Sequence, residues 1–263
     1  MGTAVGPEAH LGPVRCIPLL LYGSVRYLAK NNVTVPKENP EYAVVDNFPV
    51  LGLAEMLVTA FNGLLVLWLV LSVTQEYRTG QLRMVMLRSY SAVSIFAAKW
   101  VAAVATLLLY LGCYLGVSYL VGTWMLPNTD TVPLFFHGER VSGWEAFLYN
   151  LQFYGLAALT LVVTSAVIMG IAVASPTTTT AVGVSLVFLL TSIAYSYVLH
   201  RWQPSLDPRW SFLSLTEIQY QGITRMLAEQ PMWIGWNLTV MAGYTLCSLG
   251  LVLMLTYRHD HWT

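Results

Sequence analysis

Long apolar runs without charge dominate this sequence and constrain what it can fold into. A helix rises 1.5 Å per residue, so about 20 apolar residues are needed to cross a hydrocarbon core of about 30 Å. The runs that meet this requirement are Leu51 to Val73, Ile95 to Val121, Phe147 to Ala174, Ala181 to Leu199 and Trp233 to Thr256. Strands of a membrane β-barrel would instead alternate over about 10 residues. We therefore predict an all-α, polytopic helical membrane protein with five clear transmembrane helices.

A shorter apolar patch precedes these runs. Cys16 to Val25 is uncharged, and as a helix it would cover about 15 Å, which is half of a bilayer core. We expect a weak or incomplete N-terminal helix here and not an independent span. Residues 30–49 carry three prolines among polar side chains and predict an irregular loop. The sequence thus divides into an N-terminal segment, residues 1–49, and a transmembrane domain, residues 50–263.

The charge balance excludes several classes of protein. Only 10% of the residues are charged, against about 25% in ordinary soluble chains. Thirteen basic and thirteen acidic residues cancel, so no basic field is present to bind nucleic acid. The cysteines Cys16, Cys113 and Cys247 form no CxxC pair, which argues against a zinc site or a disulfide framework.

The orientation follows from basic residues in one short connection. Residues 76–99 contain Arg78, Arg83, Arg88 and Lys99 against a single acid. Lys and Arg of short loops stay preferentially in the cytoplasm, so we predict that this connection and the C-terminal end lie inside. Residues 30–49, 123–146 and 200–232 are then outside.

Sequence motifs of common enzymes are absent. The chain contains no GxxxxGK[ST] phosphate loop, no HExxH and no GxSxG, so we predict that it is not an enzyme and binds no cofactor or metal itself. His259, Asp260 and His261 are interpreted as a solvated tail, because no further ligand cluster is near in sequence.

The connection after the first long run includes QLRMVMLRSY, residues 81–90. Its apolar and basic residues are compatible with a short amphipathic helix lying along the membrane face. A solvated basic loop is the alternative, and composition alone favours that loop.

The order of residues in this connection resembles a known family. An acidic residue, Gly-x-Leu-Arg, a leucine and methionine run, a serine-rich break and a lysine opening the next span are similar to a segment of type-2 permeases of ATP-binding-cassette (ABC) transporters. The residues concerned are Glu76, Gly80, Leu82, Arg83, Ser89, Ser91, Ser94 and Lys99. The resemblance extends over residues 50–257 through the order of spans and loops. The sequence departs from the family pattern in its missing first span, since members have six.

The resemblance implies a function. The chain would form the translocation path of an ABC transporter for ATP-driven transport, most simply export. It would pair with a second permease, identical or different, and with cytoplasmic ATPase subunits that carry ATP and Mg, in a bacterial cell membrane. The residues expected to couple to the ATPase are Glu76, Arg78, Gly80, Leu82, Arg83, Val85, Met86 and Arg88. A non-transporting membrane scaffold or assembly subunit is the alternative, and the substrate stays open.

Three polar residues within the apolar runs are candidates for a pathway or for helix packing: Glu55, Asn62 and Asn237. We interpret Glu55 as reaching the headgroup region and the two asparagines as packing residues. Residues 200–232 are too polar to span, and their pattern favours short amphipathic helices. In the resembled family such helices roof the path on the outer side; an ordered surface loop is the alternative.

Overall fold

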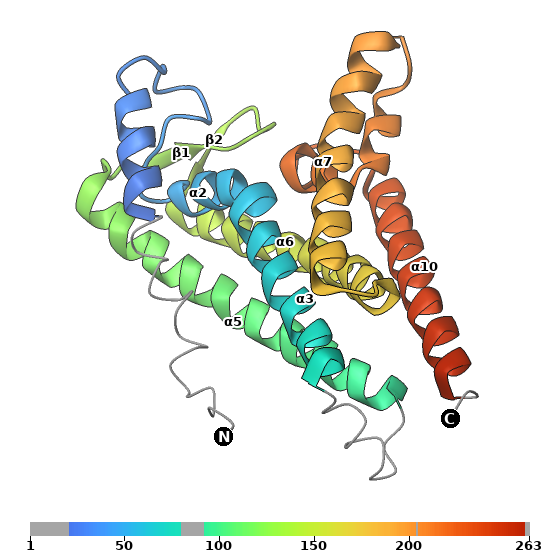
Figure 1. The fold of residues 1–263 in the computed structure, drawn as a ribbon. Helices are drawn as coiled ribbons and strands as arrows, with labels where there is room; N and C mark the ends of the chain where they lie inside the picture. The colour runs from blue at the N-terminus through green and yellow to red at the C-terminus, as the bar shows by residue number, and fades with distance from the viewer. Residues whose placement is uncertain (1–20, 80–91, 204, 261–263) are drawn as a thin grey trace. The chain divides into compact units, whose positions relative to one another are not determined.

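A computed structural model describes residues 21–79, 92–203 and 205–260 of the chain (Figure 1). These residues form helices and one hairpin of two short strands. A helix at residues 21–31 comes first. The elements that follow are α2 (Phe48–Met56), η1 (Leu57–Phe61), α3 (Asn62–Thr79), α5 (Ala92–Met125), β1 (Thr131–Pro133), β2 (Arg140–Ser142), α6 (Gly143–Ala174), α7 (Thr178–Trp202), η2 (Pro208–Leu213), α8 (Leu215–Glu217), η3 (Ile218–Gly222), α9 (Ile223–Met226) and α10 (Ile234–Asp260).

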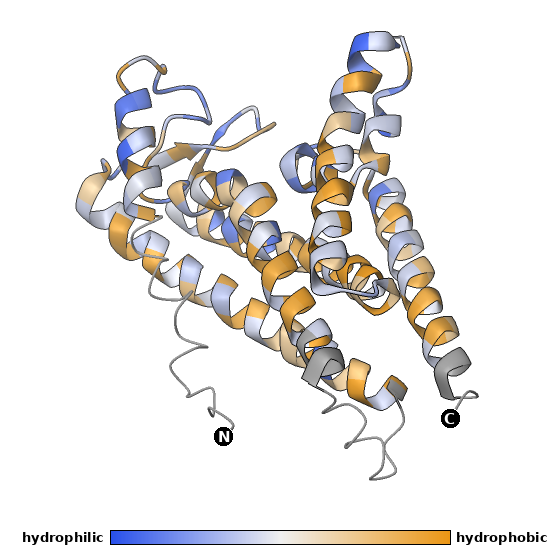
Figure 2. Cartoon of the chain, viewed as in Figure 1, coloured by the Kyte–Doolittle hydropathy of each residue, from blue (hydrophilic) through white to orange (hydrophobic). Residues whose placement is uncertain are grey.

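Five of the described helical stretches are long and apolar enough to cross a membrane. They are Phe48–Thr74, Val93–Met125, Gly143–Ala174, Thr178–Trp202 and Ile234–Thr256. Each contains one of the apolar runs predicted from sequence, or nearly all of it, so the predicted fold class is confirmed. Figure 2 shows the apolar residues distributed along these helices. The chain is therefore a multi-pass helical protein of the membrane type.

The first span is not a continuous α-helix. Its middle, η1, is a π-helical segment between α2 and α3. Such insertions are rare and occur frequently at functional sites, because they turn side chains and release backbone carbonyls from their usual partners. No local sequence signal predicts this break, since the run from Leu51 to Val73 contains neither proline nor an extended polar patch.

The contacts of the chain divide it into two compact units. One comprises Met1–Glu55, Leu108–Gly155 and Leu227–Gln230, and the other comprises Met56–Leu107, Leu156–Met226 and Pro231–Thr263. We refer to them as unit 1 and unit 2.

Unit 1 is organised around the loop before α2 and the small hairpin. Val44, Val132 and Ala146 form a buried apolar cluster, and β1 pairs antiparallel with β2 with Val132 opposite Val141. Asn47 precedes α2, accepts a hydrogen bond from the Val44 amide at 2.8 Å and donates to the Tyr42 carbonyl at 2.9 Å. These bonds hold the loop that the three prolines predicted. Burial raises the pKa of the neighbouring Asp46 carboxyl.

The N-terminal patch is described only in part. Residues 16–20 lie outside the described residues, whereas Leu21 and Val25 are fully buried in the helix at residues 21–31. The predicted loop, residues 30–49, is irregular apart from its ends, which belong to that helix and to α2. The described helix thus overlaps the predicted patch only at residues 21–25 and continues beyond it.

Unit 2 packs the four short helical elements of residues 208–226 against long helices. Its apolar core includes Val163 of α6, Phe212 and Ile218 of the short elements, and Met241 of α10. Helix α7 buries Ala181, Ser185, Leu189, Ser192 and Ser196, spaced three and four residues apart on one face. Small residues on such a face allow a close approach of backbones. The serines of this face hold the short elements in place.

Candidate functional site

The short elements between α7 and α10 are buried on one side and exposed at Arg209, Trp210 and Tyr220. Leu215, Ile218, Gln219 and Ile223 are buried, and the π-helical segment η3 contacts the π-helical segment η1 of the first span. Two breaks in regular helix, far apart in sequence, therefore meet in unit 2.

The position of this contact along the long helices indicates its depth. Asn62 comes twelve residues before Thr74, the end of the first apolar span, which corresponds to about 18 Å of helix. Thr164 comes ten residues before Ala174, the end of α6, or about 15 Å. Both values are close to half of a hydrocarbon core of about 30 Å. Gln219 thus contacts residues well inside the apolar part of the first span and of α6, and we refer to residues 208–226 as the re-entrant segment.

An amide network joins the two breaks. Asn62 donates through Nδ2 to Gln219 Oε1 at 2.7 Å, and Gln219 donates through Nε2 to Asn62 Oδ1 at 3.3 Å. Asn62 Nδ2 also reaches the Val58 carbonyl of η1 at 3.2 Å, and Gln219 Nε2 reaches Thr164 Oγ1 at 3.4 Å. Each amide group carries two donor hydrogens and one acceptor oxygen. Every polar atom of this fully buried pair therefore has a partner.

Serines of α7 anchor the re-entrant segment on its other side. Ser192 Oγ lies 2.9 Å from Ser214 Oγ, and Ser214 Oγ donates to the Ser192 carbonyl at 2.7 Å. Ser196 donates to the Ser211 carbonyl at 3.4 Å, and the Thr216 amide donates to Ser192 Oγ at 3.3 Å. The segment is therefore held by side-chain hydrogen bonds from α7 as well as from the first span and α6.

Arg225 and two aromatic rings close the segment where it leads into α10. The guanidinium carbon of Arg225 lies 5.8 Å from the Phe212 ring centre and 5.4 Å from that of Trp233, within the range of cation–π attraction. Trp233 has a φ of 57°, a left-handed conformation that costs a bulky residue about 1–2 kcal/mol. Its contacts with Arg225 and Phe212 stabilise this strained turn.

Hydrogen bonds also fix the end of α3 that leads to residues 80–91. Lys99 Nζ of α5 donates to the Ser72 carbonyl at 2.8 Å, and Thr178 Oγ1 of α7 donates to Thr74 Oγ1 at 2.8 Å. Trp100 Nε1 donates to Ser165 Oγ of α6 at 2.8 Å. Helix α3 therefore runs from the amide network at Asn62 to an end that is tied to both α5 and α7.

The residues predicted from sequence have different places in the structure. Asn62 belongs to the buried network with Gln219. Glu55 lies in unit 1, where its Oε2 accepts a hydrogen bond from Ser24 Oγ at 2.8 Å. Asn237 is fully buried near Gly222 of η3, and neither polar atom of its side chain has a hydrogen-bond partner within the described part of the chain.

The predicted coupling residues fall at the edge of the described chain. Glu76 and Arg78 belong to α3 by its bounds. The others, Gly80, Leu82, Arg83, Val85, Met86 and Arg88, lie outside the described residues. Sequence reasoning did not identify Gln219, Thr164 or Ser192 as site residues. Nothing local to Gln219 indicates a partner 157 positions away, although its place in a polar stretch between apolar runs was visible.

The family described as "Protein of unknown function (DUF2705)" matches residues 27–261, which includes every residue of the buried network. No curated protein and no solved structure matches the chain.

Replacement of either amide of the network by leucine tests its role in the fold. Asn62→Leu or Gln219→Leu alone leaves the other amide buried without its partner, which costs about 1–3 kcal/mol of unfolding free energy. The double variant removes both polar groups, so we expect it to be more stable than the sum of the single losses predicts. Thermal unfolding of the purified protein measures all three, with the exposed Gln203→Leu as control. Strictly additive losses would contradict a direct pairing.

Proposed function

This chain belongs to the protein family DUF2705, whose function is unknown, and we propose that it is the membrane-spanning subunit of an ABC transporter. In this proposal it forms part of a translocation path, and a separate ATPase subunit binds ATP and Mg and supplies the energy. The chain itself carries out no chemical reaction. Its place would be the bacterial cell membrane, with a second permease, identical or different, completing the path.

The observation that carries the proposal is the broken helix held at mid-depth by Asn62 and Gln219. Transporters commonly place interrupted helices near the bilayer midplane, where the free backbone groups and polar side chains can face a substrate path. Irregular backbone at this depth is tolerated only where protein or a water-filled cavity covers it. A scaffold or assembly subunit has no need of such a segment, which favours transport over that alternative.

The mechanism needs two arrangements of the bundle that bind differently to the ATPase in its ATP-bound state. In the described arrangement Gln219 is paired with Asn62, while the side chain of Asn237, close to Gly222 of η3, has no hydrogen-bond partner within the described residues. We propose that the re-entrant segment moves between these two asparagines. The unpaired amide of Asn237 disfavours the present arrangement and would become satisfied in the other one.

Helix α3 is the proposed mechanical link between the ATPase and this segment. Its first residue, Asn62, contacts Gln219, and its last turn leads into the residues that resemble the coupling element of the permease family. Hydrogen bonds join Lys99 of α5 and Thr178 of α7 to the C-terminal half of α3, so α5 and α7 would move with it. A displacement at residues 76–88 would thus reach mid-depth through one rigid helix.

Export is the proposed direction, and the cargo is proposed to be lipid-like or amphipathic. The last three spans contain two charged residues, Glu145 and Arg201, and both stand at span ends. A small inorganic ion would need carboxylates at the path, since ionisable groups within spans commonly mark ion pathways. A second permease can contribute residues to the path, so transport assays require the assembled complex.

Labelling of introduced cysteines tests the proposed orientation. In a variant without native cysteines, an impermeant thiol reagent applied to intact cells should label a cysteine at Asp207 but not one at Gln81, because basic residues hold residues 76–99 inside. Asp207 is partly exposed beside the exposed Arg209, whose hydrogen bond lowers the pKa of the Asp207 carboxyl. Labelling after lysis is the control for Gln81. The opposite labelling pattern would put residues 76–99 outside the cell, where a cytoplasmic ATPase cannot reach them, and it would refute the proposal.

Charge reversal within the proposed coupling element tests the function directly. Arg83→Glu should leave membrane insertion intact but abolish most co-purification of the ATPase and most substrate-stimulated ATP hydrolysis, because a like charge would face an acidic partner surface. Gly80→Pro should cause a similar loss by restricting the turn. Arg140→Glu, on the predicted outer side, is the matched control. If both variants keep the ATPase and its stimulation, residues 80–91 are an ordinary basic loop.

Removal of the unpaired amide tests the proposed second arrangement. Asn237→Leu eliminates a buried amide that has no hydrogen-bond partner within the described residues, so we expect the free energy of unfolding to rise by about 1–3 kcal/mol. Transport and stimulated ATP hydrolysis should fall at the same time, because the other arrangement loses a hydrogen bond. Thermal unfolding and ATP hydrolysis of the same preparation measure both effects, with Asn128→Leu as the exposed control. Lower stability together with unchanged hydrolysis would remove Asn237 from the mechanism.

A further inference from the structure

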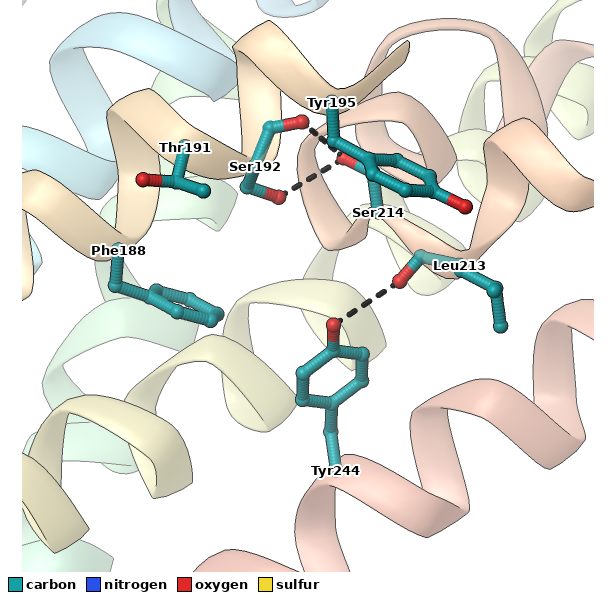
Figure 3. Close-up of a pocket in the computed structure, with 7 residues that line it drawn as sticks. All are labelled: Phe188, Thr191, Ser192, Tyr195, Leu213, Ser214 and Tyr244. Carbon is teal, nitrogen blue, oxygen red and sulfur yellow. Dashed lines mark hydrogen bonds between the residues drawn. The ribbon is translucent and has the colours of Figure 1, made fainter. Parts of the chain in front are cut away.

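A cavity of about 210 Å³ lies in unit 2 beside the re-entrant segment (Figure 3). It is lined by one face of α7, by Tyr244 of α10 and by Leu213 and Ser214 at the start of the segment. Ligand pockets for drug-sized molecules are about 300–1,000 Å³. The volume therefore suits a smaller molecule with few heavy atoms.

Three aromatic rings line this cavity. Phe188 and Tyr195 lie two turns apart on α7, and the rings of Phe188 and Tyr244 form an edge-to-face pair with the ring centres 6.2 Å apart and the planes at 71°. The faces of such rings carry a negative potential, whereas their edges are positive. Aromatic rings gathered around a small volume are the arrangement that binds alkylated ammonium groups.

Three of the five hydroxyl groups that line the cavity donate their protons to backbone carbonyls. Tyr244 donates its phenolic proton to the Leu213 carbonyl at 3.0 Å, and Tyr195 donates to the Trp210 carbonyl at 3.2 Å. Ser214 donates to the Ser192 carbonyl at 2.7 Å. A hydroxyl group has one proton, so these oxygens can only accept further hydrogen bonds. Figure 3 shows the bonds to Leu213 and Ser192 at the edge of the cavity.

This combination selects for positive charge. Ring faces and oxygen lone pairs both attract a cation or an N–H group, and they repel an anion or a ligand that only accepts hydrogen bonds. The lining residues carry no charge, so a strongly hydrated inorganic cation would lose its water without compensation. An alkylated ammonium is weakly hydrated and fits the apolar rings as well as the acceptors.

We propose that the cavity lined by Phe188, Tyr195 and Tyr244 is a binding site for a small alkylated ammonium ion. The site is independent of the proposed transport function, because it rests only on side chains of unit 2. Leu213 and Ser214 line the cavity, and Ser214 donates a hydrogen bond to Ser192 of α7. Gln219 follows five residues after Ser214. An occupied site therefore stabilises the re-entrant segment against α7 and α10.

The test compares choline with 3,3-dimethyl-1-butanol, which has the same shape and no charge. Ligand-observed NMR titration of the purified full chain measures both, with potassium chloride balancing the ionic strength. We expect choline to bind and the neutral alcohol to bind roughly fivefold to thirtyfold more weakly, the range between a partly exposed and a desolvated cation–π contact. Equal binding of the two probes, or no choline binding, would overturn the proposal.

Substitutions locate the binding. Phe188→Leu and Tyr244→Leu each remove one ring and should weaken choline binding roughly threefold to tenfold. Tyr197→Leu removes an exposed tyrosine of α7 that does not line the cavity, and it should leave binding unchanged. Thermal unfolding verifies that each variant is folded. If Tyr244→Leu does not fold, Phe188→Leu still tests the site, because it keeps the hydrogen bond of Tyr244 to Leu213. Choline binding that survives both ring substitutions would refute this site.

Discussion

Backbone amides and carbonyls at the depth of an apolar span have no water to bind, so each must find a partner within the protein. An α-helix meets this requirement locally, but η1 and residues 208–226 do not form regular α-helix. Side chains supply the missing partners: Asn62 reaches the Val58 carbonyl, and Ser192 receives the Thr216 amide. The arrangement of unit 2 depends on these bonds, since without them neither break could be buried.

The need of buried polar groups for hydrogen-bond partners also applies to two buried asparagines, and it is met differently at each. Asn62 has all its side-chain atoms satisfied, through η1 and Gln219, whereas Asn237 has no side-chain partner in the described residues. A buried amide without partners costs free energy and is retained in proteins for a reason. The re-entrant segment thus lies between a satisfied and an unsatisfied position. Such a difference is what a segment with two alternative positions requires, and it underlies the transport mechanism that we propose.

Helix α3 connects this mid-depth network to the part of the chain expected to meet an ATPase. Its two ends are held by different kinds of contact, an amide pair at Asn62 and hydrogen bonds from Lys99 and Thr178 near the other end. A regular helix with both ends tied transmits displacement with little loss, because packed elements are stiff. The proposed coupling element and the proposed path element are therefore parts of one mechanical unit, although they lie far apart in depth.

The sequence alone determined the class of the fold. The five apolar runs predicted the five long helices, because the free energy of moving a segment into hydrocarbon is close to a sum over its own residues. It also marked Asn62 and Asn237 as unusual, and it predicted short helices after α7. Its proposals for coupling residues and for an ABC transporter rest on resemblance and stay predictions.

Only the tertiary structure decided which polar groups meet. Gln219 is paired with Asn62 across 157 positions, and the small polar face of α7 holds the segment that carries it. No local pattern encodes such a pair, because the free energy of a hydrogen bond depends on atoms that approach only after the helices have packed. For the same reason the depth of residues 208–226, the π-helical breaks and the aromatic cavity at Tyr244 were not foreseen from the sequence.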